Sequence, residues 1–139
     1  MRRVLFALWL VLAAPTSGIA AEPPDPIDLA WEDCAGGGEG PNAEQMLACH
    51  AEADRAWDRA MAEAYEDLLK RLKPPSRALL VASQRQWIAF RDAEVALWQA
   101  QSTGGDDLNA EVNLHSAAAD IARGRALYLR KFRDYFWTD

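Results

Sequence analysis

Apolar side chains recur at helical spacing along most of the chain, and the longest such pattern follows residue 42. Asn42 is suited to cap a first turn, and Gln45 three residues later completes a capping-box pattern. Proline disfavours helical geometry in the residue before it, so Lys73-Pro74-Pro75 is expected to end this helix. The apolar positions between these signals fall three or four residues apart: Met46, Cys49, Ala53, Trp57, Met61, Ala64, Leu68 and Leu72.

Two further helices follow from the same spacing. One is expected from about Ser76 to Gln101, and its stripe comprises Leu79, Leu80, Ser83, Trp87, Phe90, Leu97 and Trp98. After a turn at 102–105, Asp106 or Asp107 is expected to cap the other, whose stripe comprises Leu108, Val112, His115, Ala118, Ile121, Ala122, Leu129 and Phe132. No segment alternates apolar and polar residues as a strand does. The pattern predicts an all-α fold, a small antiparallel bundle of three long helices joined by short turns. A helical hairpin with a loosely attached third helix is the alternative.

The segment before the first predicted helix, residues 21–41, has no such periodicity. It carries Pro23, Pro24 and Pro26, and then the glycines of 36–38 and Gly40, and both residue types interrupt regular structure. We therefore expect an irregular N-terminal arm over 21–41, followed by a helical domain over 42–139.

The first twenty residues have the pattern of a cleaved signal peptide. Arg2 and Arg3 precede an apolar run from Val4 to Ala14, and Gly18-Ile19-Ala20 offers small residues for cleavage after Ala20. The run is too short for a membrane anchor, which needs roughly 20 apolar residues. The sequence thus predicts an exported protein, periplasmic or secreted, with no stable membrane insertion after cleavage.

Export changes the interpretation of the two cysteines, Cys34 and Cys49. An even pair in an exported protein is typical of a disulfide. The alternative, a metal site, lacks a recognisable zinc spacing, because only His50 lies nearby. We expect a Cys34–Cys49 disulfide that ties the arm to the first helix.

The chain is acidic, with 15 Lys and Arg against 21 Asp and Glu. Removal of Arg2 and Arg3 with the signal peptide leaves 13 basic residues against the same 21 acidic ones. Such a surface repels phosphate backbones, which argues against nucleic acid as a partner. It would instead attract a cationic protein.

Catalytic chemistry has little support in the sequence. Neither His50 nor His115 lies in a zinc motif or beside a recognisable nucleophile. His115 falls on an apolar stripe, as a core or boundary histidine would, and His50 is expected to face solvent. The glycines of 36–38 lack the lysine and Ser/Thr of a phosphate-binding loop. We expect no enzyme activity, no cofactor and no metal.

The most distinctive segment is QRQWIAFRDAE, residues 84–94. On a helix Trp87 and Phe90 share one side, and Arg91 and Glu94 continue the same stripe. A buried arginine needs a partner from another helix, which the sequence leaves open between Arg123 and Glu66. We interpret the segment as a helix-locking cluster that is mainly structural, with a ligand site as the alternative. Its characteristic residues are Gln84, Arg85, Trp87, Phe90, Arg91 and Asp92.

Together with Cys34, Met46 to Cys49, Tyr65-x-x-Leu68 and the Arg-x-Arg at Arg123 and Arg125, this segment resembles the LprI-type lysozyme-inhibitor family of bacterial envelope proteins. The resemblance extends from about Trp31 to Leu129. Members commonly carry two further cysteines, which this chain lacks: Val95 stands near the first position and 116–118 near the second. The resemblance implies the same helical fold, held by packing where a second disulfide is missing.

The resemblance also implies a function: binding and blocking lysozyme without catalysis. The protruding acidic residues expected to contact a cationic lysozyme are Glu32 and Asp33 in the disulfide loop, and Asp106 and Asp107 in the last turn. The alternative is an envelope interaction or scaffold module with no lysozyme activity, which would use an apolar patch such as Trp98, Phe136 and Trp137. The oligomeric state is left open by the sequence.

Overall fold

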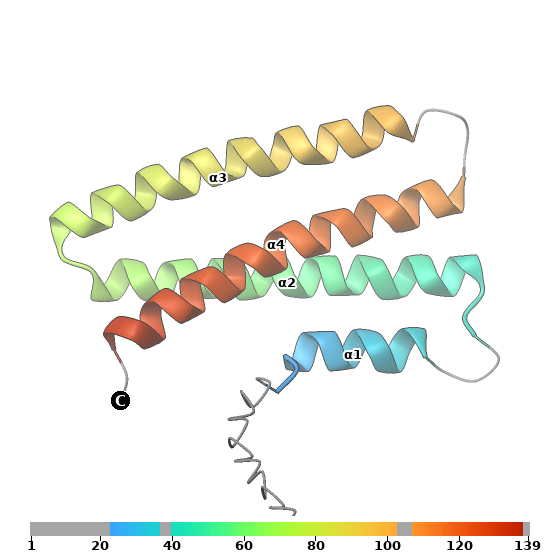
Figure 1. Cartoon of the computed structure of the whole chain (residues 1–139), viewed down its shortest axis with the longest axis horizontal. Helices are drawn as coiled ribbons and strands as arrows, with labels where there is room; N and C mark the ends of the chain where they lie inside the picture. Colours follow the sequence, from blue (N-terminus) through green and yellow to red (C-terminus); the bar gives the residue numbers. More distant parts are fainter. Residues whose placement is uncertain (1–22, 37–39, 103–106, 138–139) are drawn as a thin grey trace, which may run out of the picture.

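The computed structural model describes residues 23–36, 40–102 and 107–137, and these form four α-helices and no strand (Figure 1). The helices are α1 (Pro26–Ala35), α2 (Ala43–Arg71), α3 (Pro74–Gln101) and α4 (Leu108–Phe136). The predicted all-α class is confirmed, but the prediction of three helices is wrong by one. The expected signal peptide of residues 1–20 lies outside the described residues.

The additional helix is α1, whose ten residues lie in the middle of the arm that was expected to be irregular. The Asp25 carboxylate accepts a hydrogen bond from the Ile27 N–H at 2.9 Å and so caps the helix. Pro26 occupies the first turn, where its missing N–H costs nothing because the first turn's N–H groups have no intrahelical acceptor. The helix ends at Gly36, where a Cβ would lie 2.7 Å from the Glu32 carbonyl oxygen. The proline and the glycine therefore mark the two ends of a helix here.

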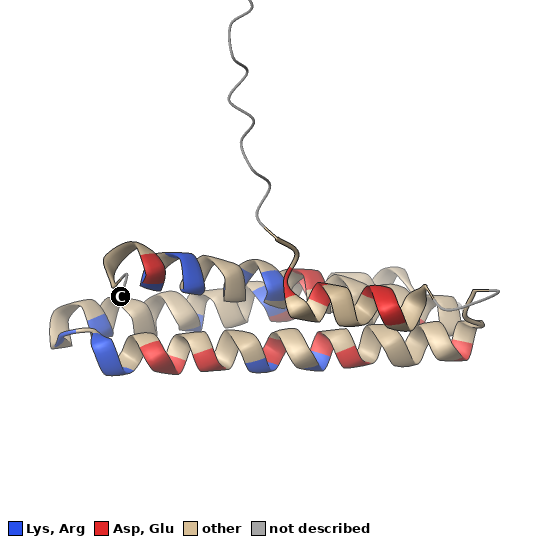
Figure 2. Cartoon of the chain, turned by 90° about the horizontal axis from the view of Figure 1, so that it is seen from below, with Lys and Arg blue, Asp and Glu red and all other residues tan. Residues whose placement is uncertain are grey.

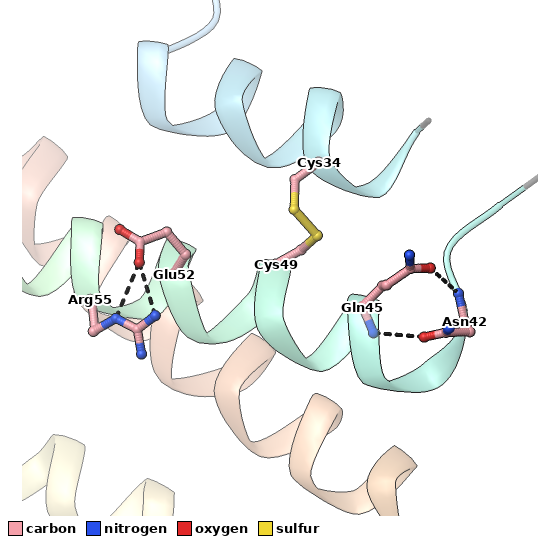
Figure 3. The surroundings of a disulfide bond; sticks show 6 residues. All are labelled: Cys34, Asn42, Gln45, Cys49, Glu52 and Arg55. Carbon is pink, nitrogen blue, oxygen red and sulfur yellow. Dashed lines mark hydrogen bonds and ion pairs between the residues drawn. A yellow bond between two sulfur atoms is a disulfide. The ribbon is translucent and has the colours of Figure 1, made fainter. Parts of the chain in front are cut away.

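The expected ends of the long helices are close to those observed. Asn42 and Gln45 form a reciprocal capping box at the start of α2, with hydrogen bonds of 2.8 and 2.9 Å (Figure 3). α3 starts at Pro74, two residues before the predicted Ser76, because prolines fit the first turn of a helix. Of the two residues expected to cap α4, Asp107 does so by accepting from the Asn109 N–H, and Asp106 lies outside the described residues.

Consecutive helices run in opposite directions, as predicted, but the closest pairing is between α2 and α4, which run the same way (Figure 1). These two helices form the core between them. Its central residues are Trp57, Ala60, Met61, Ala64 and Leu68 from α2, and Ala119, Ala122, Ala126 and Leu129 from α4. The many alanines allow the two backbones to approach closely.

Helix α3 lies along one edge of this pair and buries only Gln84. Its predicted apolar stripe is therefore only partly internal: Leu80 and Trp87 pack against the core, whereas Phe90 is 52% exposed. The physical reason is the direct contact of α4 with α2, which leaves α3 no central position. Helix α1 packs on the other side of the pair (Figure 1).

Candidate binding surface

The predicted Cys34–Cys49 disulfide is present and joins the last turn of α1 to α2, with a Cα–Cα distance of 5.8 Å (Figure 3). Two ion pairs of 2.6 Å hold α1 to α4 as well: Arg123 with Asp28, and Arg130 with Asp25. Both guanidinium groups lie over the Trp57 ring, at 5.4 and 5.8 Å from its centroid. Helix α1 is thus fixed at both ends.

These ion pairs could not be predicted from the sequence, because Asp25 and Asp28 lie in the segment expected to be irregular. Arg123 donates a bidentate hydrogen bond to the Asp28 carboxylate, which raises the pKa of the Arg123 guanidinium. The ion pair with Asp28 explains why Arg123 of the Arg-x-Arg motif faces α1 rather than the cluster on α3.

Gln84 is the central residue of the characteristic segment on α3, and its side chain links three helices. Its Nε2 donates to the Met61 sulfur of α2 at 3.1 Å, and its Oε1 accepts from the Arg125 Nε of α4 at 3.1 Å. Only 7% of Gln84 is exposed. A buried polar group whose donor and acceptor are both satisfied fixes the position of a helix.

Trp87 lies one turn further along α3, between two guanidinium groups. Arg91 and Arg125 are 5.4 and 6.0 Å from its ring centroid. Arg91 also approaches the Asp58 carboxylate of α2 at 3.9 Å and Asp92 at 2.9 Å, so its partner is neither Arg123 nor Glu66. The exposed Arg85 and Phe90 take no part in this cluster. The contacts of Gln84, Trp87 and Arg91 are those of a structural link between helices.

The two histidines lie on the side of α2 and α4 that α1 covers in part. His115 pairs with Asp54 at 2.9 Å and is half-buried, as expected of a boundary histidine. His50 was expected to face solvent, but it is partly buried, with its ring 5.3 Å from that of Trp31. Burial lowers the pKa of His50, although the nearby Asp120 acts in the opposite direction. The difference arises because α1 was not predicted.

A groove of about 390 Å³ runs between α1 and the α2–α4 pair. Trp31, Glu32, His50 and Asp120 line it, and the buried Trp31 Nε1 has no acceptor among the described residues. Glu32, which was predicted to contact a partner, therefore lines the same groove as Asp120 of α4, which the sequence analysis did not single out.

Charge is divided unequally between the two ends of the molecule (Figure 2). One end comprises residues 29–35, 43–54, 92–101 and 107–122; we call it the acidic end. It contains ten carboxylates and no lysine or arginine: Glu32, Asp33, Glu44, Glu52, Asp54, Asp92, Glu94, Asp107, Glu111 and Asp120. The rest of the described chain, the basic end, has 13 lysines and arginines against seven carboxylates. The predicted residues Glu32, Asp33 and Asp107 are all exposed at the acidic end, and Asp106 lies outside the described residues.

Among the described residues there is no group of three or more His, Cys, Asp or Glu side chains arranged to hold a metal ion. Within the same ranges, no helix has a stretch long and apolar enough to cross a bilayer. The described part of the chain is thus small, disulfide-linked and all-helical, and its acidic and basic residues are concentrated toward opposite ends.

The model of a family described as "Lysozyme inhibitor LprI" matches residues 34–129, which is most of the chain. The chain therefore belongs to the LprI lysozyme-inhibitor family, and the resemblance found in the sequence is confirmed. Neither the curated proteins nor the solved structures contain a significant match. The matched segment starts at Cys34 and ends at Leu129, so it includes the disulfide and the contacts of Gln84 and Arg125.

Proposed function

We propose that this protein binds a lysozyme through its acidic end and blocks it without catalysis. The observation that carries the proposal, beside the family, is the concentration of ten carboxylates and no lysine or arginine at one end of the molecule. Lysozymes that attack bacterial walls are often strongly cationic. The opposite charges of the two proteins would speed their encounter and orient the inhibitor with its acidic end foremost.

The exposed residues Glu32, Asp33 and Asp107 are proposed to make the contacts. Glu32 and Asp33 lie on the last turns of α1, which the disulfide and the two ion pairs hold against α2 and α4. Asp107 is fixed in a capping hydrogen bond. A contact surface that is already rigid loses little conformational entropy on binding.

Export belongs to the same proposal. The pattern of residues 1–20 and the disulfide both fit an oxidising compartment outside the cytoplasm. We propose that the protein acts in the periplasm or beyond it, where a lysozyme would meet it before reaching the cell wall.

The proposal is tested by titrating the disulfide-bonded protein, from residue 21 onward, into a cell-wall lysis assay with a cationic chicken-type lysozyme. Saturable inhibition near one-to-one stoichiometry is expected, and it should weaken with salt, because screening shortens to about 3 Å at 1 M ionic strength. Failure of the folded protein to inhibit any of several lysozyme classes would contradict it.

A matched pair of variants locates the surface. Glu32→Gln with Asp33→Asn removes two charges from the acidic end, and Glu63→Gln with Glu66→Gln removes two from exposed sites on α2 outside it. The first pair is expected to weaken inhibition about tenfold, as loss of roughly 1.4 kcal/mol would, and the second to have little effect. Equal effects of the two pairs would show that only net charge matters.

The second candidate function, a scaffold for other envelope proteins, is favoured by aromatic residues near the end of α4. Tyr135 is 80% and Phe136 58% exposed, and the ring of Phe136 contacts that of Phe132 at a centroid distance of 4.9 Å. An apolar contact through these rings would be insensitive to salt. Binding of an envelope protein that resists high salt, with no inhibition of lysozyme, would favour this function.

A further inference from the structure

The solvent-facing side of α3 is apolar, although solvent-facing sides of helices are normally charged or polar. Leu79, Phe90 and Leu97 are 72%, 52% and 55% exposed, and their spacing places them along one edge of that side. Between residues 79 and 100, nine positions at the centre of this side and along that edge carry no charge. They are Leu79, Ala82, Gln86, Ala89, Phe90, Ala93, Ala96, Leu97 and Ala100, all exposed.

The other edge of this outward side carries two opposite charges one heptad apart, Arg85 and Asp92. Both are exposed, and Arg91 contacts only the Oδ1 atom of Asp92. Seven residues correspond to nearly two turns, so the two side chains lie on the same line along the helix. Large apolar side chains along one edge, small ones along the middle and charged residues along the other edge are typical of a helix that packs against another helix.

The distribution of charge along α3 and the rest of the molecule indicates which helix packs against this side. Residues 74–91 of α3 belong to the basic end of the molecule and residues 92–101 to the acidic end. A second copy in the opposite orientation places each acidic end beside the other's basic end. A copy in the same orientation would place like charges together, which is unfavourable.

We propose that the outward side of α3 is the interface of an antiparallel homodimer with two-fold symmetry. A symmetric dimer uses the same surface on both copies, and the sequence of α3 fits that requirement. Arg85 and Asp92 lie equally far from the midpoint between Ile88 and Ala89. A two-fold axis at that midpoint brings Arg85 of each copy beside Asp92 of the other, and Leu79 of each copy near Leu97 of the other.

This inference goes beyond the proposed lysozyme binding and does not depend on it. Helix α1, with Glu32 and Asp33, lies on the opposite side of the α2–α4 pair from α3 (Figure 1). Glu32 and Asp33 therefore stay accessible in both copies of the dimer, although Asp92 of the acidic end is covered.

Sedimentation velocity of the disulfide-bonded protein, from about 1 to 100 μM, tests the proposal. Twice the monomer mass is expected at the upper concentrations. Phe90→Glu or Leu97→Glu should abolish the dimer without changing the circular dichroism spectrum, because both side chains are exposed in the monomer. Tyr135→Glu, a matched change at an exposed aromatic residue outside the interface, should leave the dimer intact.

A charge exchange tests the antiparallel arrangement. Arg85→Asp alone and Asp92→Arg alone should each weaken dimerisation about tenfold, since each change introduces repulsion at two symmetric contacts. The double variant should restore the dimer, because each new charge again meets its opposite. A monomer at all concentrations, a dimer that survives Phe90→Glu, or no recovery in the double variant would overturn the proposal; a monomer would leave this side of α3 to a different protein.

Discussion

At the scale of single residues, Gln84, the one buried polar side chain among the described residues, connects three of the helices. Alanines make up five of the nine buried core residues of the α2–α4 pair. The Gln84 amide donates to Met61 and accepts from Arg125, so both hydrogen bonds depend on the position of α3.

Replacing Gln84 with alanine is therefore expected to lower the free energy of unfolding by about 1–3 kcal/mol, since it leaves the Arg125 guanidinium without an acceptor there. Urea unfolding followed by circular dichroism measures this. The matched control is Gln86→Ala, a glutamine two residues away that faces solvent, and it should change stability by less than about 0.5 kcal/mol. Equal losses in both variants would contradict the role assigned to Gln84.

His50 connects stability to pH. Burial lowers its pKa in the folded protein, so below about 6.5 the unfolded chain binds a proton that the folded chain resists. Stability is thus expected to fall as pH drops through this range. A His50→Gln variant should lose less stability than the natural protein between about pH 7.5 and 5.5, as measured by thermal unfolding. A fall of the same size in both proteins would rule out His50 as the cause.

At the scale of helices, the sequence predicted the features that depend on residues close together in the chain, such as the helix ends. Asn42, Gln45 and Pro74 mark helix ends through contacts within a few residues, so the ends of α2 and α3 were predicted to within two residues. The characteristic segment was correctly placed on a helix that contacts its neighbours. Trp87 is only partly buried, because a stripe of apolar residues does not reveal which helices form the central pair.

The sequence could not predict α1 or the surface it creates. Pro26 and the following glycines have the composition of a loop, and a ten-residue helix with no buried residue has a weak pattern of its own. Its stability comes from residues about 15 to 105 positions away: Cys49, Arg123 and Arg130. Glu32, Asp33 and Asp107 are exposed, and their common location at one end follows only from the arrangement of the helices.

The disulfide is expected to hold α1 in place. Replacing Cys34 and Cys49 with serine should cost roughly 3 kcal/mol for a loop of this length, with the loss concentrated in α1. Hydrogen exchange should then become fast for residues 26–35 and stay slow in the centres of α2 and α4. Asp28→Asn, which weakens one ion pair but keeps the disulfide, should have a smaller effect. Unchanged protection of α1 in the serine variant would mean that the ion pairs suffice.

At the scale of the whole molecule, the separation of charge is the feature that unites the proposals. It exposes carboxylates on α1 and at the start of α4 for a cationic protein, and it favours opposite orientations for two copies that pair through α3. The negative residues near the first turns of α2 and α4 also interact favourably with the helix dipoles. The same distribution therefore contributes to helix stability and to recognition.

The most direct measurement is hydrogen–deuterium exchange of the disulfide-bonded protein with and without a saturating cationic chicken-type lysozyme. The account predicts added protection at residues 29–35 and 107–115, and little change at 76–90 of α3 or near the end of α4. Protection confined to α3 or to the aromatic end of α4, or no protection anywhere, would contradict the claim that the acidic end binds lysozyme.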